Sequence, residues 1–192
     1  MYKPRFRTIL TMLVMLLCPL LVMRLICEDR QKRTDQLLLT SPVSLPGIVL
    51  GKYFSAFCVY LVAISASLLM AVVLSFYGEP DWPVIIGNII GLVLLGASLI
   101  AVCMFLSSIT ESQVIAAVSG FAVSLLLVLM DAMINVVSGR VVQKIFSYMS
   151  FNGRYNGFTI GIIDFSNVLF FVSIGALFIL LTAAVLEKRR WS

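Results

Sequence analysis

Few residues in this sequence could carry out chemistry, and the missing types narrow the possible functions. The chain has 192 residues and no histidine, which excludes Ser-His-Asp triads, zinc sites built on histidine and haem held by histidine. Its four cysteines lie in or beside apolar segments and lack the spacing of a metal site: Cys18, Cys27, Cys58 and Cys103. We expect no disulfide among them and no metal bound by this chain.

The run from Gly47 to Tyr53 resembles a phosphate-binding loop but lacks its essential features. A P-loop has four residues between its glycines, and its Lys is followed by a Ser or Thr that holds Mg²⁺. Here three residues separate Gly47 from Gly51, and Tyr53 follows Lys52. We therefore interpret Gly51 as a point of close helix packing and Lys52 as an anchor at the lipid headgroups. The chain is not expected to hydrolyse ATP.

Asp131 and Asn135 are polar residues placed one helical turn apart in an apolar segment. An ionisable side chain at membrane depth is by default a functional hypothesis, for example in proton coupling or substrate contact. The alternative is that Asp131 reaches water, because Gly139 follows it by only about two turns. We favour the second interpretation, whereas the first makes Asp131 and Asn135 candidates for a translocation path.

The composition indicates that membrane helices position these residues. Hydrophobic residues make up 61% of the chain and charged residues 12%, whereas soluble domains are about half apolar and a quarter charged. The apolar runs match the thickness of a bilayer, and in lipid they must be helices because every backbone polar group needs an internal partner. The sequence predicts an all-α membrane protein, a polytopic bundle of about five transmembrane helices forming one domain over residues 1–192. The expected spans are residues 8–26, 53–77, 84–106, 114–138 and 168–186.

The basic residues give an orientation and argue against nucleic acid as a partner. Lys and Arg are slightly more numerous on the cytoplasmic side if residues 28–52 and the C-terminus face the cytoplasm, as the positive-inside rule requires. The net charge of +5 suits a surface of anionic lipid. Bases scattered among loops on both sides do not form the basic patch that nucleic acid needs.

Small residues in the third expected span predict close contacts between helices. Gly87 and Gly91 form a GxxxG pattern, and Gly96 and Ala97 follow. Such residues let helix backbones approach closely in lipid. The contact could lie within the chain or between subunits, and we favour the first. The short turn at residues 107–113 predicts a tight antiparallel pair of the third and fourth spans.

Residues 139–167 are too polar to span the membrane and too hydrophobic for a free loop. Aromatic residues are spread along this segment, and glycines interrupt it. That composition is typical of short helices that lie in the interface or enter the membrane as a re-entrant hairpin. Ser166 or Asp164 is expected to cap the helix that follows.

The connector at residues 28–52 has a composition that a plain loop does not need. A charged stretch is followed by three apolar residues, Leu37, Leu38 and Leu39, and then by Ser-Pro. An apolar patch next to water indicates a docking surface for a soluble partner. The alternative is an amphipathic helix on the membrane surface.

Several of these segments together resemble a known family. Residues 33–44 read RTDQLLLTSPVS and residues 47–52 read GIVLGK, with SSITESQ at 107–113, GIID at 161–164 and EKRRWS at 187–192. In these motifs the chain resembles an ABC-2-type transporter permease and, within that group, the gliding-motility-associated ABC export permeases. The first block is specific and the last supports it. Family members have an N-terminal interfacial helix and six spans, and this chain begins at what would be the second span.

The resemblance implies that the connector carries a cytoplasmic coupling helix. This helix would dock onto a separate P-loop ATPase subunit, which would bind the ATP, while this chain would bind no cofactor. The implied contact residues are Arg30, Thr34, Asp35, Leu37, Leu38 and Leu39. The resemblance also implies that residues 139–167 form an outer re-entrant segment, and that the chain is a multi-pass protein of a bacterial cell membrane.

The expected function is that of the permease subunit of an ATP-driven exporter. Few residues at membrane depth are polar, so this chain alone offers no polar channel. We therefore expect a second permease subunit, identical or different, around a shared path lined by Asp131 and Asn135. The alternative is an accessory or scaffold membrane subunit without transport activity of its own.

Overall fold

The computed structural model describes most of the predicted bundle. The described residues are Pro19, Leu21, Val22, residues 45–75, 82–110, 112–134 and 151–159, Gly161, and residues 164–190. They form the helices α4 (Leu45–Ser75), α5 (Trp82–Ile109), α6 (Gln113–Ile134), α8 (Phe151–Thr159) and α9 (Phe165–Arg190). These described residues contain helices and no strand, which confirms an all-α membrane protein.

Three described helices are long and apolar enough to cross a membrane. They contain the segments Pro46–Ala66, Trp82–Ile109 and Phe165–Lys188, and a shorter apolar segment covers Gln113–Leu127. The expected spans 84–106 and 168–186 lie within α5 and α9. The expected span 8–26 is described only at Pro19, Leu21 and Val22.

Helix α4 begins earlier than the sequence indicated. It starts at Leu45, inside the range 28–52 that we assigned to the connector. Pro46 is compatible with this start, because the first helical turn has no intrahelical partner for a backbone N–H. The last eight residues of the assigned connector are therefore the first two turns of a helix, and the connector ends before Leu45.

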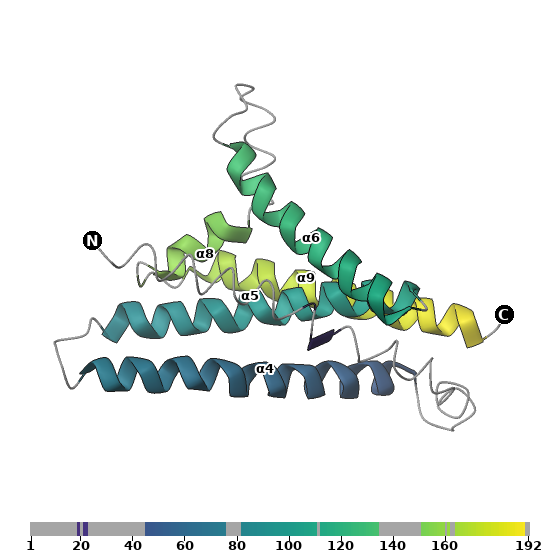
Figure 1. The fold of residues 1–192 in the computed structure, drawn as a ribbon, viewed down its shortest axis with the longest axis horizontal. Coiled ribbons are helices and arrows are strands. Elements are labelled where there is room, and N and C mark those ends of the chain that lie inside the picture. The colour runs from purple at the N-terminus through teal and green to yellow at the C-terminus, as the bar shows by residue number, and fades with distance from the viewer. Residues whose placement is uncertain are drawn as a thin grey trace.

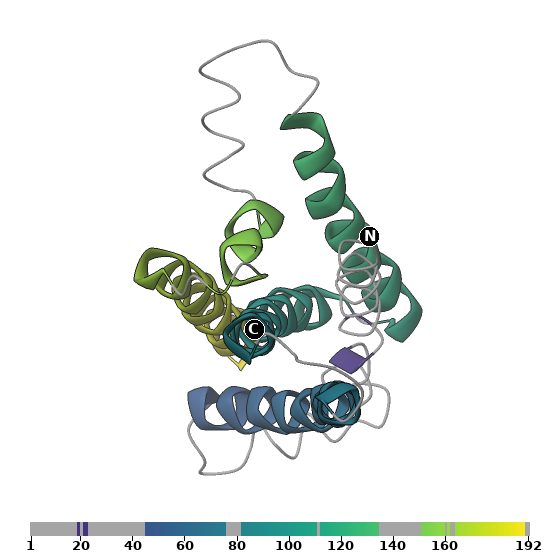
Figure 2. The same ribbon diagram turned by 90° about the vertical axis from the view of Figure 1, so that its left-hand side faces the viewer.

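Helix α5 forms the centre of the bundle. Figure 2, viewed along the bundle, shows α4, α9, α8 and α6 arranged around it. Its largest interface is with α9, and half of its 28 residues are buried. Figure 1 shows that α8 lies at the end where α5 and α9 begin, whereas α4 begins and α9 ends at the opposite end.

Helix α6 does not follow α5 along its whole length. The connecting turn is short, as expected, since α5 ends at Ile109 and α6 begins at Gln113. Beyond the turn, however, α6 crosses the bundle obliquely (Figure 1). Its buried residues Ala116, Gly120 and Ser124 recur every four residues on one face, and a Cβ at Gly120 would lie 3.2 Å from Cβ of Pro19. The expected tight antiparallel pair is therefore confined to the region near the turn.

Several hydroxyl groups of these apolar helices are satisfied by carbonyls of their own helix. Ser98 donates to the Leu95 carbonyl at 2.8 Å and Thr182 to the Phe178 carbonyl at 2.7 Å, so neither hydroxyl needs a partner on another helix. At the start of α9, the Asp164 carboxylate accepts a hydrogen bond from the Ser166 N–H at 3.1 Å. Of the two expected caps, Asp164 is therefore the one that is present.

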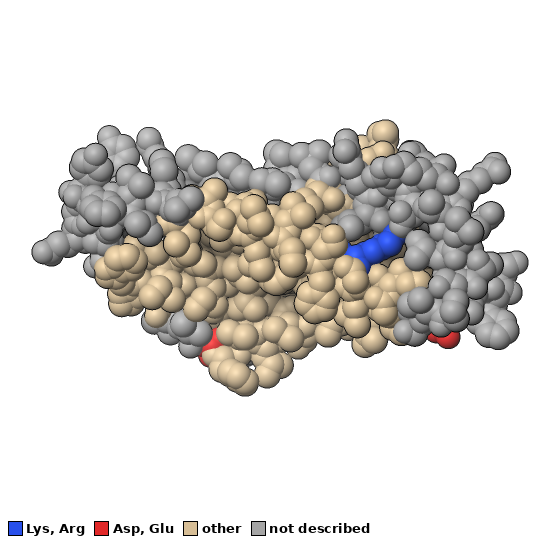
Figure 3. All heavy atoms as spheres, turned by 90° about the horizontal axis from the view of Figure 1, so that it is seen from below, with Lys and Arg blue, Asp and Glu red and all other residues tan. Residues whose placement is uncertain are grey.

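The outward faces of α4, α6 and α9 are apolar. Val62 is 71% exposed, Val114 is 70% exposed and Leu180 is 70% exposed. Figure 3 shows the α4 side as a broad and mostly uncharged surface, with one basic patch among the described residues and two small acidic patches along its lower edge. Exposed surface of this kind is matched by lipid tails, which have the polarity of such side chains.

Candidate functional site

The structure does not test the residues that the sequence placed in the ATPase contact and the translocation path. Those of the contact lie outside the described residues: Arg30, Thr34, Asp35, Leu37, Leu38 and Leu39. Asn135 lies outside them as well. Asp131 lies in the last described turn of α6, where its backbone is described and its side chain is not. The roles of all eight residues stay predictions.

Within the described residues, the candidate functional site is the surface of α5 on which α8 packs, the seat of α8. Gly87 and Gly91 face α8, whose Tyr155 and Phe158 are fully buried. A Cβ at Gly91 would lie 2.8 Å from Cβ of Phe158 and 3.0 Å from Cε2 of Tyr155. A Cβ at Gly87 would overlap the backbone carbonyl oxygen of Phe158. The GxxxG pattern therefore serves a contact within the chain, as we favoured, and lets α8 reach the backbone of α5.

Polar side chains fasten α8 to the two neighbouring helices. The Tyr155 hydroxyl donates a hydrogen bond to Oδ1 of Asn88 on α5, at 2.5 Å. Arg154 Nη1 donates to Oδ1 of Asn167 on α9, at 3.3 Å. The Arg154 guanidinium also lies 4.1 Å from the centre of the Phe170 ring, a distance that is typical of a cation–π contact. The bond from Tyr155 joins segments that are 67 positions apart, and the bond from Arg154 joins helices that are separated by a turn.

An aromatic cluster completes the seat of α8. Phe151 of α8 contacts Phe170 and Phe171 of α9 edge-to-face, with ring centres 5.7 Å and 5.6 Å apart. Phe158 lies 6.5 Å from Phe171. Edge-to-face pairs contribute about 0.5–1.5 kcal/mol each beyond the burial of their surface. Helix α8 is thus held on one side by glycines and on the other by phenylalanines.

The turn after α8 brings the chain back towards the start of α5. Gly161 has a φ of +83°, a conformation that costs glycine little and other residues more. Its N–H donates to the Phe158 carbonyl at 3.1 Å, which closes the end of the helix. A Cβ at Gly161 would lie 3.4 Å from the backbone of Pro83. The expected outer segment is therefore a short helix and a tight turn packed on the bundle, as far as the structure describes it.

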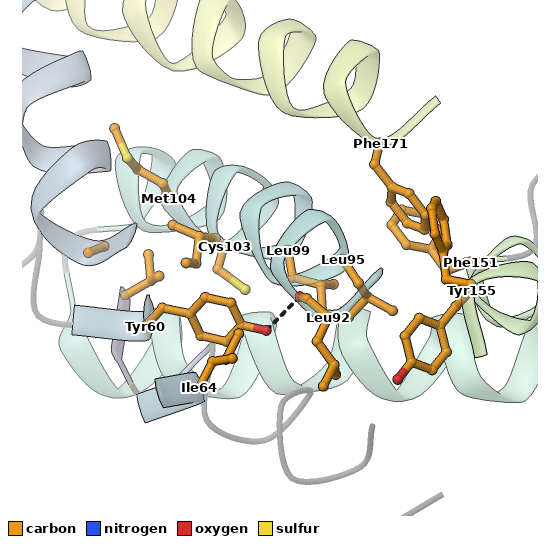
Figure 4. Close-up of a cluster of buried hydrophobic side chains, with 14 of the residues drawn as sticks. Tyr60, Ile64, Leu92, Leu95, Leu99, Cys103, Met104, Phe151, Tyr155 and Phe171 are labelled. Atoms are coloured by element: carbon orange, nitrogen blue, oxygen red, sulfur yellow. Dashed lines mark hydrogen bonds between the residues drawn. The ribbon is translucent and has the colours of Figure 1, made fainter. Parts of the chain in front are cut away.

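A second close contact joins α4 to α5. The fully buried Tyr60 donates its hydroxyl hydrogen to the Leu92 carbonyl at 2.8 Å, as Figure 4 shows. Tyr53 donates in the same way to the Ala97 carbonyl at 3.2 Å. The ring of Tyr60 occupies the space that a Cβ at Gly96 would fill. Gly96 thus exposes the helix backbone to a tyrosine of the neighbouring helix.

Within the described part of the chain, Gly51 makes no close helix contact of the kind that the sequence suggested. No described atom lies within 4 Å of the position that its Cβ would take, so Gly51 is not a point of close packing within the described chain. Gly87, Gly91 and Gly96 do pack closely; they lie on α5 and face bulky residues of α8 and α4. Whether a glycine packs closely depends on which helix lies against it. That neighbouring helix is far away along the chain, so the sequence around the glycine does not reveal it.

Removing the Tyr60 hydroxyl is expected to have a small, measurable effect. Tyr60→Phe keeps the ring over Gly96 and loses the bond to the Leu92 carbonyl, so the free energy of unfolding should fall by about 0.5–1 kcal/mol. Thermal unfolding in detergent, followed by intrinsic fluorescence, measures this loss. Ser65→Ala is the control, because the exposed Ser65 donates to the Val62 carbonyl of its own helix. A Tyr60→Phe protein as stable as the wild type would contradict the role of the hydrogen bond.

Sequence reasoning missed the side chains that fasten α8. It assigned the aromatic segment to an outer re-entrant element but did not pair Tyr155 with Asn88. One signal was present: Asn88 is a polar residue inside the GxxxG pattern of a highly apolar helix. A polar side chain there is expected to meet a partner. Among the described residues, no group of three or more Cys, Asp or Glu side chains could hold a metal ion.

Comparison with known proteins adds one finding. A family model described as "ABC-2 family transporter protein" matches residues 1–191 of the chain, a range that contains all the described helices. No curated protein and no solved structure matches the chain. The narrower resemblance to gliding-motility-associated permeases is not addressed by this match and stays a prediction.

Proposed function

This chain belongs to the ABC-2 family of transporter proteins, and on that premise we propose that it is the permease subunit of an exporter driven by a separate P-loop ATPase. Family membership and the long apolar helices make the chain a permease-type membrane component of an ABC transporter. The match over residues 1–191 carries the proposal. ATP would be bound and hydrolysed by the partner subunit, and this chain would bind no cofactor.

The topology of the described helices supports a cytoplasmic end and an outer end of the bundle with different roles. The connector leads into the start of α4, and the basic end of α9 lies at that same end (Figure 1). We assign this end to the cytoplasm, in agreement with the positive-inside rule. Helix α8 then lies at the outer end, opposite the proposed ATPase contact. The membrane would be a bacterial cell membrane.

The proposed transporter contains two permease subunits around a shared path. The described helices show large apolar outer faces, and polar side chains at membrane depth are few. A polar route through the membrane is therefore more readily formed between two chains than within one. Asp131 and Asn135 are proposed to line this route near its outer mouth.

Disrupting the leucine patch should release the ATPase. In the variant Leu37→Asp with Leu38→Asp, two charges replace the apolar residues that would fill the cleft of the partner. Buried unpaired charges of this kind weaken a protein contact by several kcal/mol, roughly a hundredfold or more in affinity. The measurement is co-purification of the ATPase in mild detergent, with mass spectrometry of the captured subunits. Gln31→Asp, which adds charge to the same connector outside the patch, is the control.

Two results would contradict this proposal in different ways. If the double variant retains the ATPase as well as the wild type, the leucine patch is not the docking surface. If the wild-type chain captures no ATPase at all, the accessory or scaffold role is favoured over transport. Membrane insertion of each variant is checked by its resistance to extraction with carbonate.

A further inference from the structure

One short stretch of α5 is contacted from two sides by helices that do not pack substantially on each other. This stretch, residues 88–96, meets α4 on one face and α8 on another. Figure 4 shows Tyr60 and Tyr155 on either side of it, within one cluster of buried side chains. α4 and α8 are not among the helix pairs with substantial contacts. A displacement of α4 can therefore reach α8 through α5.

On the α4 side, the contact is made by one tyrosine against backbone. The Tyr60 hydroxyl is 2.8 Å from the Leu92 carbonyl oxygen, and its ring covers Gly96. Because the ring rests on a residue without a side chain, no flexible group lies between Tyr60 and the backbone of α5. A movement of Tyr60 then moves the helix itself, since packed interiors are stiff.

On the α8 side, a second tyrosine makes a similar contact. The Tyr155 hydroxyl bonds to Oδ1 of Asn88, and its ring lies against Gly91. Asn88 and Leu92 are separated by about one helical turn, roughly 6 Å along the axis. The two tyrosines therefore act on adjacent turns of the same helix, from different sides.

We propose that Tyr60 and Tyr155 are positioning residues that couple α4 to the outer helix α8 through residues 88–96 of α5. The inference rests on the proposed function, in which the connector before α4 receives the movement of the ATPase. Helix α4 passes this movement to α5 at Leu92 and Gly96, and α5 passes it to α8 at Asn88 and Gly91. The nucleotide state at one end of the bundle thereby sets the position of the helix at the other end.

The test is a double-variant cycle in the purified complex of this chain with its ATPase, reconstituted in lipid nanodiscs. A cysteine-free background carries Gly153→Cys on the exposed side of α8, and the rate of maleimide labelling is measured with and without ATP and vanadate. The variants are Tyr60→Leu, Tyr155→Leu and the two combined. Tyr60→Phe and Tyr155→Phe retain the rings and serve as conservative variants that are expected to fold.

In the wild type, ATP with vanadate is expected to change the labelling rate. Each leucine variant should reduce this nucleotide-dependent change by roughly twofold to thirtyfold, the range known for coupling between sites. Combining them should reduce it no further than one variant alone, because both interrupt the same route. Ser65→Leu provides the control: Ser65 is exposed on α4 and bonds to the Val62 carbonyl of its own helix. This variant should leave the nucleotide-dependent change in labelling unaltered.

Three results would overturn the coupling. The effects of Tyr60→Leu and Tyr155→Leu could multiply, which would mean that they act independently. The label could fail to respond to nucleotide in a wild-type complex that hydrolyses ATP. The third result concerns α9, because α4 also contacts α9. If Phe171→Leu is non-additive with Tyr60→Leu and Tyr155→Leu is not, the coupling runs through α9 instead of α5. Failure of the proposed function itself is recognised separately, because no ATPase would then co-purify.

Discussion

Gly96→Ala is expected to lower the free energy of unfolding by about 3 kcal/mol, the upper end of the usual range for overpacking. The added methyl group would occupy the same space as the ring of Tyr60. That ring cannot move aside easily, because Tyr60 is 2% exposed and bonds to the Leu92 carbonyl. The seam between α4 and α5 must therefore open. Thermal unfolding in detergent, together with resistance to denaturation by SDS, measures the loss.

A second substitution separates this clash from a general effect on the helix. In the background Tyr60→Leu the ring is gone, so Gly96→Ala should cost less than about 1 kcal/mol there. Gly51→Ala is the matched control, because nothing described lies within 4 Å of its Cβ position and alanine is the better helix former. Equal losses from Gly96→Ala in both backgrounds would show that Tyr60 does not rest on Gly96.

Gly87→Ala is expected to detach α8 from the bundle. The methyl group would meet the backbone carbonyl oxygen of Phe158, and it would lie 3.2 Å from the Cα of Gly161. Both are backbone atoms, so no side chain can rotate to make room. If the seat loses about 3 kcal/mol, amide hydrogen exchange in residues 151–159 should become roughly a hundredfold faster.

The controls for Gly87→Ala differ from those for Gly96→Ala. Truncating a side chain, as in Phe158→Ala, should not restore the protection of α8, because the clash is with the main chain. Gly175→Ala, at a buried glycine of α9 with nothing described within 4 Å of its Cβ position, should leave exchange in α8 unchanged. If protection of α8 survives Gly87→Ala, the close seat on α5 is wrong.

The sequence predicted an all-α membrane protein because membrane spans depend on local composition. Residues 84–106 and 168–186 were placed within α5 and α9, since a bilayer requires long apolar runs with all backbone groups bonded internally. Helix α4 begins at Leu45, ahead of the expected span 53–77, and Pro46 and Gly47 belong to its first turn. Both residues are tolerated in the first turn of a helix, where propensity has little influence.

The partners of individual side chains could not be predicted in the same way. Tyr155 and Asn88 are separated by 67 positions, and Tyr60 and Leu92 by 32. No local pattern specifies which tyrosine meets which carbonyl or amide, because that depends on how the helices pack. The GxxxG pattern indicated that α5 would be approached closely, but the identity of the approaching helix required the structure.

The central position of α5 also has a consequence for how the protein is made. Its largest partner is α9, which ends about 80 residues after α5 ends. At usual elongation rates, α5 leaves the ribosome about 4–16 s before α9 is complete. During this interval the interface for α9 is open to lipid. Ser98 and Ser108, on the buried side of α5, bond to carbonyls of their own helix, so these two hydroxyls need no partner on α9 during this interval. Among the described helices, α9 is thus the one whose arrival closes the largest interface of α5.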